Sequence, residues 1–441
     1  MASVKIDFSR TQGKIKNMNS VNNGPISSVR AFTNFNDYKA ARIPYARNHD
    51  ASFYAGFGGE FSVDVHRIFR DFSADENDPS SYSFKSTDDY VKTTYEAGTR
   101  VFYRLGSAIE HYEKRGTIPP KDFLKWAKIC EHIVRHYTEG WANGFFYDME
   151  YWEIWNEADC KNGDGSKPCW QGTDDQFIDL FITTYRHLKS CFPKLKIGGP
   201  AFAWQKGCPE LIDKLFTRLN SEGLKLDFYS YHSYGSTTEH LVKDMRMAKE
   251  IVDKYNQPQA ELILNEWNYV RGWSGDDWAH TLKAEKSLKG ASFITAIMCE
   301  GQREPVDMLM YYDARPCGMN GMFGTDTFER LKGYYPIAYF SNLLDLGTYV
   351  PSEGDDPEIY TCSAKNGENG ATLLTYFNDN GSPEQKRVEI ELDSLKDNAK
   401  VEVFLLDESH DMEKIMELTL SKKVKIALDV SVFSTYYISV K

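Results

Sequence analysis

The amino-acid sequence predicts an α/β protein, a (β/α)8 TIM barrel followed by a smaller β-sandwich domain. Across residues 17–346, short apolar runs alternate with longer amphipathic stretches, as is typical of repeated βα units around a parallel sheet. Eight such repeats in this length favour a closed barrel over an open, doubly wound sheet. Across residues 347–441 the pattern changes to short strands broken by turns, as in a β-sandwich.

The barrel strands are predicted where apolar runs are short, because parallel strands are buried on both faces. They are expected at residues 15–21, 42–48, 99–105, 151–155, 195–199, 226–231, 261–265 and 306–312. Apolar residues at helical spacing predict the intervening helices. Clear examples are expected at residues 121–137, 174–191, 239–255, 287–300 and 334–346. No glycine-rich phosphate-binding motif follows any of these strands, which weakens a nucleotide-binding alternative.

The β-sandwich is predicted from runs that Gly, Asn and Asp interrupt at short intervals. Its strands are expected at residues 358–365, 371–378, 386–392, 400–406, 416–420, 423–428 and 435–440. An opening strand at 4–8 lies outside the barrel pattern, so we expect the N-terminal segment, residues 1–16, to join this sheet.

Charge and hydropathy exclude several classes of partner. The chain has 52 Lys and Arg residues against 64 Asp and Glu, a formal net charge of −12, and its basic residues do not gather in one segment. No nucleic-acid partner is expected, because phosphate binding needs a concentrated basic surface. The chain has no run of about 18 apolar residues, so no membrane contact is expected. The first residues lack a signal-peptide pattern. We therefore expect a cytoplasmic protein, or an exported one whose signal peptide is missing from this sequence.

The eight cysteines are scattered without a CxxC pair, which favours reduced and mostly buried thiols. Cys160 and Cys169 are the closest pair and flank a polar loop. A disulfide between them is the alternative in an exported protein.

Two predicted strands end in an Asn-Glu pair. Residues 151–157 read YWEIWNE and residues 262–266 read LILNE, so Glu157 and Glu266 follow apolar strands. The carboxyl ends of barrel strands form the active-site face, and burying a carboxylate costs several kcal/mol unless it is paired or protonated. Hydrolysis of a glycosidic bond needs two carboxyl groups, one acidic and one ionised. The alternative is that each glutamate caps a helix or pairs with an arginine at the rim.

These motifs resemble those of the clan A glycoside hydrolases. In that clan the general acid/base follows an Asn at the end of the fourth barrel strand, and the nucleophile ends the seventh. On the strand count above, the resemblance implies that Glu157 is the general acid/base and Glu266 the nucleophile of a retaining enzyme that needs no cofactor and no metal.

Within the clan, the chain resembles family 39, the β-xylosidase and α-L-iduronidase family. The supporting residues are Asn22-Asn23-Gly24-Pro25 after the first strand, Arg47-Asn48-His49-Asp50 at the second and His232-Ser233-Tyr234 at the sixth. The β-sandwich after the barrel also fits this family. The segment at the second strand departs from the Arg-x-His-Gly run of a typical xylosidase, which leaves the sugar open.

The resemblance implies a set of sugar contacts around the two glutamates. Asn156 would hold the 2-hydroxyl of the sugar, and His49 would bind another hydroxyl. His232 and Tyr234 are two apart on a strand and so point the same way, which would let Tyr234 donate a hydrogen bond to Glu266.

For each of the remaining candidate residues, a structural role is the alternative to a role in the site. Trp267 and Trp273 could form a stacking wall for sugar rings, or could pack against a neighbouring loop. Arg104 could line the site or form a buried ion pair. Asp313 or Arg315, after the eighth strand, could touch substrate or take part in structural pairing. His132 and His136 lie four apart on a helix without an HExxH motif, which favours a solvated helix face over a metal site.

The sequence therefore predicts a retaining glycoside hydrolase whose catalytic barrel spans 17–346. We expect it to be exo-acting and β-xylosidase-like or a related glycosidase, working by double displacement on an oligosaccharide or glycoside. A homo-oligomer is left open. The alternatives are a catalytically silent carbohydrate-binding barrel and a metal-dependent barrel hydrolase.

Overall fold

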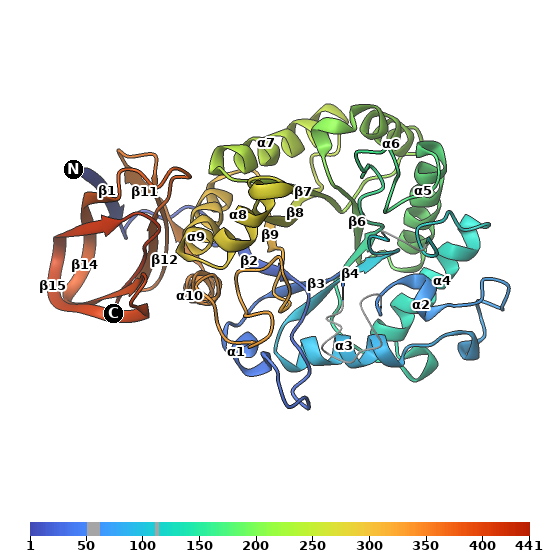
Figure 1. Cartoon of the computed structure of the whole chain (residues 1–441), viewed down its shortest axis with the longest axis horizontal. Coiled ribbons are helices and arrows are strands. Elements are labelled where there is room, and N and C mark those ends of the chain that lie inside the picture. Colours follow the sequence, from blue (N-terminus) through green and yellow to red (C-terminus); the bar gives the residue numbers. More distant parts are fainter. Residues whose placement is uncertain (51–61, 111–113) are drawn as a thin grey trace.

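The computed structural model describes residues 1–50, 62–110 and 114–441 of the chain. It consists of a barrel ringed by helices and a separate layered β domain, seen side by side in Figure 1. Both ends of the chain lie in the β domain, so the barrel is formed by the middle of the sequence.

Eight parallel strands close the barrel in sequence order, which confirms the predicted (β/α)8 fold. The strands are β2 (Asn17–Asn22), β3 (Tyr45–Asn48), β4 (Arg100–Leu105), β5 (Tyr151–Ile154), β6 (Lys196–Phe202), β7 (Phe228–Gly235), β8 (Glu261–Tyr269) and β9 (Met308–Tyr311). The last strand closes onto the first through the pairing of Val21 with Tyr311.

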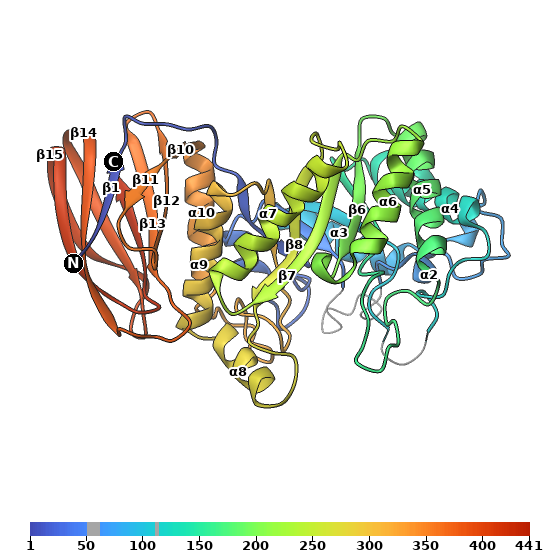
Figure 2. The ribbon, with the colours of Figure 1, turned by 90° about the horizontal axis from the view of Figure 1, so that it is seen from above.

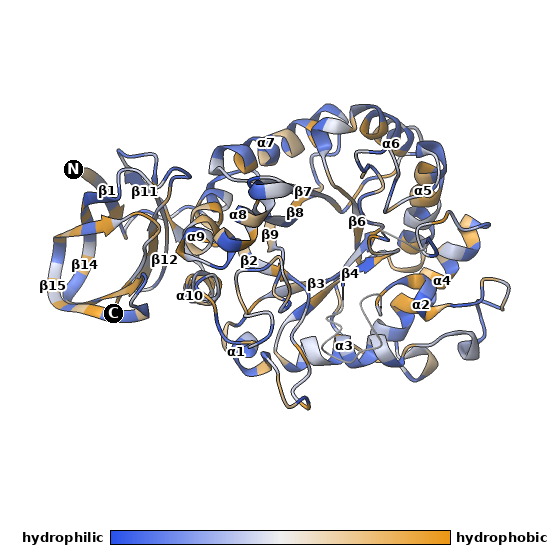
Figure 3. Cartoon of the chain, in the orientation of Figure 1, coloured by the Kyte–Doolittle hydropathy of each residue, from blue (hydrophilic) through white to orange (hydrophobic). Residues whose placement is uncertain are grey.

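Helices surround the barrel with their apolar faces inward. They are α1 (Phe35–Ala40), α2 (Val65–Ile68), α3 (Lys85–Glu96), α4 (Phe123–Thr138), α5 (Asp174–Cys191), α6 (Pro209–Ser221), α7 (Thr238–Lys254), α8 (Gly275–Glu285), α9 (Leu288–Arg303) and α10 (Tyr334–Leu346). Helix α5 begins where the sequence predicts, because Thr173 and Gln176 form a reciprocal capping box. Figure 3 shows apolar and hydrophilic residues interleaved along outer helices such as α6 and α7, as amphipathic helices require.

The barrel interior is layered. At its amino-terminal end, inward side chains form a small apolar cluster: Tyr45, Phe102, Tyr151, Phe228, Ile263, Met308 and Met310. Because strand side chains alternate, the residues two positions further along form the next inward layer. That layer is polar and fully buried, and it contains Arg47, Arg104, Glu153, Ser230 and Asn265. A polar layer therefore lies between the apolar floor and the open carboxyl ends of the strands.

The β domain is one continuous sheet folded over its own apolar core. Its strands are β1 (Ala2–Asp7), β10 (Thr348–Val350), β11 (Ser352–Gly354), β12 (Ile359–Asn366), β13 (Asn369–Tyr376), β14 (Gln385–Leu406), β15 (Asp411–Ser431) and β16 (Thr435–Val440). Strand β1 pairs in parallel with β14 and antiparallel with β11. The N-terminal strand is thus part of a sheet otherwise built from the C-terminal end of the chain.

Strands β14 and β15 each span two of the strands that the sequence pattern predicts. The pattern predicts two short strands in each region, but the structure has a single hairpin with register shifts near Leu395. Ser394 and Asn398 adopt positive φ angles there, so the strand bends without ending. Polar turn-forming residues therefore mark β-bulges in this hairpin and not turns.

The β domain packs against the barrel through α9 and α10, which face its sheet in Figure 2. Ser292 of α9 donates a hydrogen bond to the carbonyl of Tyr376 over 3.0 Å, and the hydroxyls of Thr295 and Thr435 lie 3.3 Å apart. At the carboxyl end of β8, the Tyr269 hydroxyl also donates to Asp379 of the β domain over 2.7 Å. Within the described ranges, no helix combines the length and apolar character that a membrane span needs.

Candidate active site

Glu157 lies at a sharp backbone bend after β5. Trp155 and Glu157 both have positive φ, 74° and 49°, a conformation that costs non-glycine residues about 1–3 kcal/mol. The bend is tied to both neighbouring strands, because Trp155 N–H donates to the carbonyl of Leu105 over 2.7 Å and Glu157 N–H donates to that of Ala201 over 2.9 Å. The Trp155 indole is buried and donates to the carbonyl of Cys169. The carboxyl group is thereby held at the barrel mouth.

Glu266 lies opposite, near the carboxyl end of β8. In the pairing of β7 with β8, His232 is the direct partner of Glu266. Nδ1 of His232 lies 2.8 Å from Oε1 of Glu157 and 3.5 Å from Oε2 of Glu266. One donor atom from each of these three residues lies within 4.8 Å of the others. The two glutamates singled out in the sequence therefore meet in one site, with a histidine between them.

Cationic and hydroxyl groups surround the Glu266 carboxylate. Its Oε1 accepts a hydrogen bond from Nη1 of Arg47 over 2.6 Å, and its Oε2 accepts one from the Tyr234 hydroxyl over 2.8 Å. Burial alone would raise the pKa of Glu266, but His232, Arg47 and the Tyr234 hydrogen bond outweigh it and lower the pKa to about 2. Glu266 is ionised at neutral pH, as a nucleophile must be.

Arg47 donates hydrogen bonds to four residues of the site. Besides Glu266, it donates from Nε to Oε2 of Glu153 over 2.6 Å, from Nη2 to Oδ1 of Asn156 over 2.7 Å and from Nη1 to Asn22 over 3.1 Å. Its side chain is fully buried. One planar guanidinium thus fixes both the predicted nucleophile and the residue before the predicted acid.

Glu153 is a buried residue that sequence reasoning missed. Its Oε1 accepts hydrogen bonds from the Ser230 hydroxyl over 2.6 Å and from the Asn265 amide over 2.5 Å. Asn265, the Asn of the second Asn-Glu motif, thus helps to hold Glu153 in its ion pair with Arg47. A charge at an inward strand position was the available signal, since Glu153 interrupts an otherwise apolar strand four residues before Glu157.

His49 faces Glu266 as a neutral ring. Arg104, which has only donors, reaches Nδ1 of His49 over 3.2 Å, so the ring carries its proton on Nε2. That nitrogen lies 3.8 Å from Oε1 of Glu266 and 3.7 Å from Oδ1 of Asp50. Burial and the nearby Arg47 hold the pKa of His49 well below its ordinary value. Arg104 itself forms a buried ion pair with Asp64 over 2.6 Å, the structural one of its two expected roles.

The expected stacking role of Trp267 is wrong. Because Glu266 points into the barrel, its neighbour Trp267 points outward, where its fully buried ring packs between Tyr311 and Phe293. Trp273 differs, since its ring is 61% exposed and lies edge-on to Tyr234 at a centroid distance of 5.2 Å. Only Trp273 of this pair is available to a ligand.

Asp313 lies behind the site and does not reach its surface. Its side chain is fully buried and binds the backbone N–H and the Nε of Arg315, so the structural alternative holds. Burial raises the pKa of Asp313 to about 6. Arg315 in turn lies 3.3 Å from Asp50, which also accepts a hydrogen bond from the Tyr312 hydroxyl over 3.0 Å. This cluster forms the wall of the mouth beside His49.

The expected solvated face for His132 and His136 is wrong for one of the two. The His136 ring is buried, stacks on Phe84 and bonds to Asp88 over 2.9 Å. His132 is half-buried, and its Nδ1 lies 2.9 Å from the carbonyl of Lys128. Both rings have structural partners on or beside their own helix.

All eight cysteines lie in the described part of the chain and are free thiols. The Cys169 thiol donates to Oε2 of Glu157 over 3.7 Å. The predicted reduced state therefore holds, and the alternative disulfide with Cys160 is not formed.

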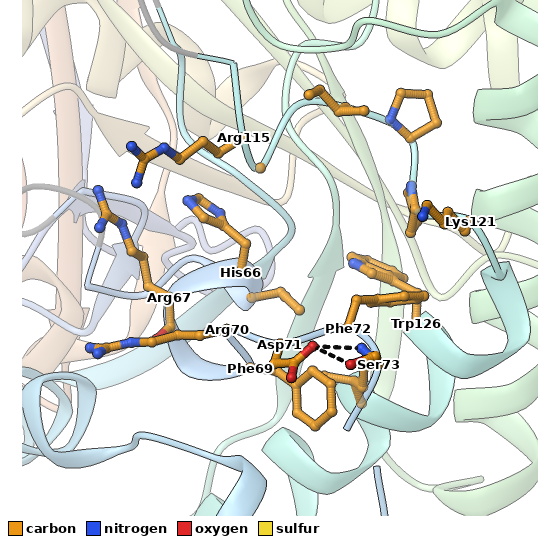
Figure 4. A pocket seen from close by; sticks show the side chains of 16 residues that line it. His66, Arg67, Phe69, Arg70, Asp71, Phe72, Ser73, Arg115, Lys121 and Trp126 are labelled. Atoms are coloured by element: carbon orange, nitrogen blue, oxygen red, sulfur yellow. Dashed lines mark hydrogen bonds between the residues drawn. The ribbon is translucent and has the colours of Figure 1, made fainter. Parts of the chain in front are cut away.

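A large cavity lies between α2 and the loop that leads to α4. Its volume is about 850 Å³, and Figure 4 shows His66 beside Arg67 and Arg115, with Trp126 across the cavity. Asp64, the residue before α2, connects this region to His49 through Arg104. Asp64, Arg104 and His49 thus lie between the cavity and Glu266.

Several solved structures share this fold at low sequence identity. A glucosidase from Croceicoccus marinus matches with a TM-score of 0.81 and 19% identity, covering 100% of this chain and 99% of that one. A monomeric beta-xylosidase from Caulobacter crescentus CB15 matches with a TM-score of 0.73 and 16% identity, covering 100% and 99%. These similarities support the TIM barrel with its β-sandwich domain.

Two proteins of known description are similar to this chain in sequence. A beta-xylosidase from Caldicellulosiruptor saccharolyticus is 25% identical over 287 residues, which are 60% of this chain and 55% of the relative. Another from Geobacillus stearothermophilus is 22% identical over 373 residues, 75% of this chain and 69% of the relative. The match thus spans little more than half the length of the first relative. The sequence model described as glycosyl hydrolases family 39 matches residues 3–304. The chain therefore belongs to glycosyl hydrolase family 39.

Proposed function

We propose that this protein is a retaining, exo-acting glycoside hydrolase that releases β-linked xylose or a closely related sugar. The observation that carries the proposal is the close approach of Glu157 and Glu266, whose carboxylate oxygens come within 4.8 Å. Retaining enzymes hold their carboxyl groups about 5–5.5 Å apart, whereas inverting ones leave roughly 6.5–9.5 Å for a water molecule. The separation here suits direct attack on the sugar.

In the first step, Glu266 attacks the anomeric carbon while Glu157 protonates the departing oxygen. Glu266 is suited to this role because Arg47 and Tyr234 keep it ionised and aimed. Glu157 is the more exposed of the two, with 16% of its side chain accessible against 7% for Glu266. It can therefore meet the leaving group as it departs towards solvent.

In the second step, Glu157 takes a proton from water, and the resulting hydroxide equivalent breaks the glycosyl ester on Glu266. His232 contacts both glutamates, so a positive charge on its ring can offset the negative charges that form on them during the reaction. Burial lowers its pKa, but the carboxylates of Glu266 and Glu157 raise it above the ordinary value overall. A positively charged ring between the two carboxyl groups favours the state in which both are ionised, after protonation of the leaving group.

Asn156 is placed to bind the sugar 2-hydroxyl. Its Oδ1 accepts from Arg47, so the amide orientation is fixed and Nδ2 remains to donate to the sugar. Such a contact strengthens as positive charge develops on the ring. His49, with its proton on Nε2, can donate to a second hydroxyl.

The names of two relatives support xylose as the sugar, since both are described as beta-xylosidases. A panel of p-nitrophenyl β-xyloside, β-glucoside, β-galactoside, α-arabinoside and iduronide tests this proposal directly. We expect fastest turnover of the xyloside and a product that keeps its anomeric configuration.

A catalytically silent carbohydrate-binding barrel is the outcome that would replace this proposal. A 2-fluoro xylosyl inactivator distinguishes the two, because it forms a stable ester only with an active nucleophile. Mass spectrometry should place the adduct on Glu266. Binding of xylo-oligosaccharide without hydrolysis and without an adduct would favour the silent barrel.

A further inference from the structure

Two thiols lie directly against the Glu157 carboxylate. Cys160 and Cys169 flank the loop between β5 and α5, which closes on itself when Asn162 N–H donates to the carbonyl of Ser166 over 2.8 Å. This turn returns the chain to the barrel mouth. As a result, both Sγ atoms and a carboxylate oxygen of Glu157 lie within 4.8 Å of one another.

The backbone bend that holds Glu157 also holds both cysteines. Cys160 N–H donates to the carbonyl of Glu157 over 2.9 Å, and the Trp155 indole donates to the carbonyl of Cys169, also over 2.9 Å. The Cys169 thiol lies 3.7 Å from Oε2 of Glu157. The cluster is therefore built into the strand end and does not depend on the loop tip.

Two sulfurs and a carboxylate form a donor set for a soft divalent cation. Tetrahedral zinc has metal–sulfur distances of about 2.3 Å and metal–oxygen distances of about 2.0–2.2 Å, which place sulfur and oxygen ligands about 3.5 Å apart. The 3.7 Å separation of Cys169 and Glu157 is close to that value. We propose that Glu157, Cys160 and Cys169 form a binding site for a soft divalent cation such as Zn²⁺ or Cd²⁺.

The site is accessible from solvent on one side. Cys160 is half-buried and lines a cavity of about 480 Å³ that Asp159 and the exposed Trp204 also border. Cys169 is fully buried on the other side of the cluster. A cation can thus enter past Cys160, bind three protein atoms and keep water as its fourth ligand.

Binding would exchange protons for the cation. Two S–H groups release their protons to water, two metal–sulfur bonds form, and the carboxylate of Glu157 becomes the third protein ligand. The protons leave as the metal–sulfur bonds form, because the thiolate and not the thiol is the metal ligand. A coordinated Glu157 can neither give nor take a proton. Inhibition of hydrolysis is the consequence, and this part rests on the proposed function.

Two other donor clusters among the described residues compete for the same ions. One is Glu157 with His232 and Glu266, and the other is Glu131 with His187 and Cys191 on α4 and α5. The cluster with His232 and Glu266 contains no sulfur, so a metal–thiolate absorption band distinguishes the proposed site from it. The cluster on α4 and α5 contains Cys191, so a Cys191 variant distinguishes the proposed site from that one.

The test is a titration of the fully reduced protein with Cd²⁺ alone, followed by the ultraviolet charge-transfer band of cadmium thiolate. A phosphine reductant is removed beforehand, and eight free thiols are counted. We expect one equivalent to give the band in the wild type and in Cys191→Ser. In Cys160→Ser the affinity should fall by at least about tenfold, because a direct ligand is lost. Cys160 is half-buried, so this variant should fold, and its turnover with Cd²⁺ is compared with its own metal-free turnover.

Activity provides the second readout. Cd²⁺ should abolish turnover of the wild type and of Cys191→Ser at the concentration that produces the band, and a chelator should restore it. Inhibition without a thiolate band, or a band lost in Cys191→Ser but kept in Cys160→Ser, would overturn the proposal. The absorbance readout holds whether or not the protein hydrolyses xylosides, so failure of the site and failure of the proposed function remain distinct.

Discussion

Nη1 of Arg47 donates a hydrogen bond to Oε1 of Glu266 over 2.6 Å, and both side chains are buried. Through its other nitrogens the same guanidinium reaches Glu153 and Asn156. The charge of the nucleophile and the orientation of the residue before the acid therefore depend on one side chain. Changes at this position should be visible both in the pH dependence of the reaction and in stability.

Arg47→Met should move the acidic limb of kcat/KM to higher pH. The folded pKa of Glu266 lies below its unfolded value, so its ionised form contributes stability that is present above pH 4–5 and lost as pH falls towards about 2. Removing Arg47 raises that pKa and leaves two buried carboxylates without their cation, at a cost of about 3–5 kcal/mol. A pH–rate profile and urea unfolding at pH 7 measure the two effects.

Arg100→Met is the matched control, because Arg100 begins β4 in an exposed ion pair with Asp148. It should change stability by less than about 1 kcal/mol and leave the pH profile unchanged. If Arg47→Met is too unstable to assay, Arg47→Lys can replace it, because lysine keeps the positive charge but lacks the planar guanidinium with its several N–H donors. An unmoved acidic limb in both Arg47 variants would show that Arg47 does not set the pKa of Glu266.

Glu266→Gln should lower turnover of an aryl β-xyloside by about 10³-fold or more, because the amide cannot form the glycosyl ester. The fold should remain intact, since the amide oxygen can still accept from Arg47 and the amide NH2 can donate to the Tyr234 hydroxyl oxygen. Glu261→Gln makes the same substitution at the other end of β8, where Glu261 pairs with Lys196, and should retain turnover. Substantial activity remaining in Glu266→Gln would move the nucleophile to another residue.

Glu157→Ala should slow substrates with poor leaving groups by about 10²–10⁴-fold and activated aryl glycosides far less, because only the former need a proton. The shortened side chain leaves room for azide beside the glycosyl ester. Azide should then restore turnover and give a glycosyl azide of retained configuration, which nuclear magnetic resonance can assign. An azide product of inverted configuration would contradict the double-displacement mechanism.

The fold and the pair of glutamates follow from local sequence patterns. The bounds of α5 and α10 agree with the predicted ranges, because capping and apolar periodicity are properties of neighbouring residues. Glu157 and Glu266 follow from strand position alone. The pairing of Arg47 with Glu153 spans 106 residues, and nothing local indicates which inward charges meet across a barrel.

Two errors have more specific causes. Trp267 was assigned to the mouth, and the two-residue period from the inward Ile263 and Asn265 agrees with that assignment, but a register shift after Leu264 turns Glu266 inward and Trp267 outward. The length of β14 was missed for a similar reason. Ser394 and Asn398 look like turn residues, and only the pairing with β15 shows that the strand continues through them.

Tyr234→Phe should lower kcat by about 10-fold or more with little change in KM. The variant removes the hydrogen bond to Oε2 of Glu266, which helps to hold the pKa of that carboxylate low. The acidic limb of the pH profile should therefore also shift upwards. Tyr229→Phe is the control on the same strand, because its hydroxyl points outward to Gln205. Equal effects of the two substitutions would mean that the loss is structural.

Glu285→Gln should stabilise the protein, and increasingly so at higher pH. Glu285 is fully buried at the end of α8, and its carboxyl oxygens have no hydrogen-bond partner among the described residues. Burial raises its pKa to about 9 from an ordinary value of 4.5. Between pH 4.5 and pH 9 the Glu285 carboxylate must therefore bind a proton when the protein folds, which costs free energy. The cost is absent below pH 4.5 and reaches about 3 kcal/mol at pH 7, at about 1.4 kcal/mol per pH unit. Urea unfolding of both proteins at pH 5 and pH 8 measures it. The gain should be small at the lower pH and several kcal/mol at the higher, whereas a gain independent of pH would mean that Glu285 is not protonated by folding.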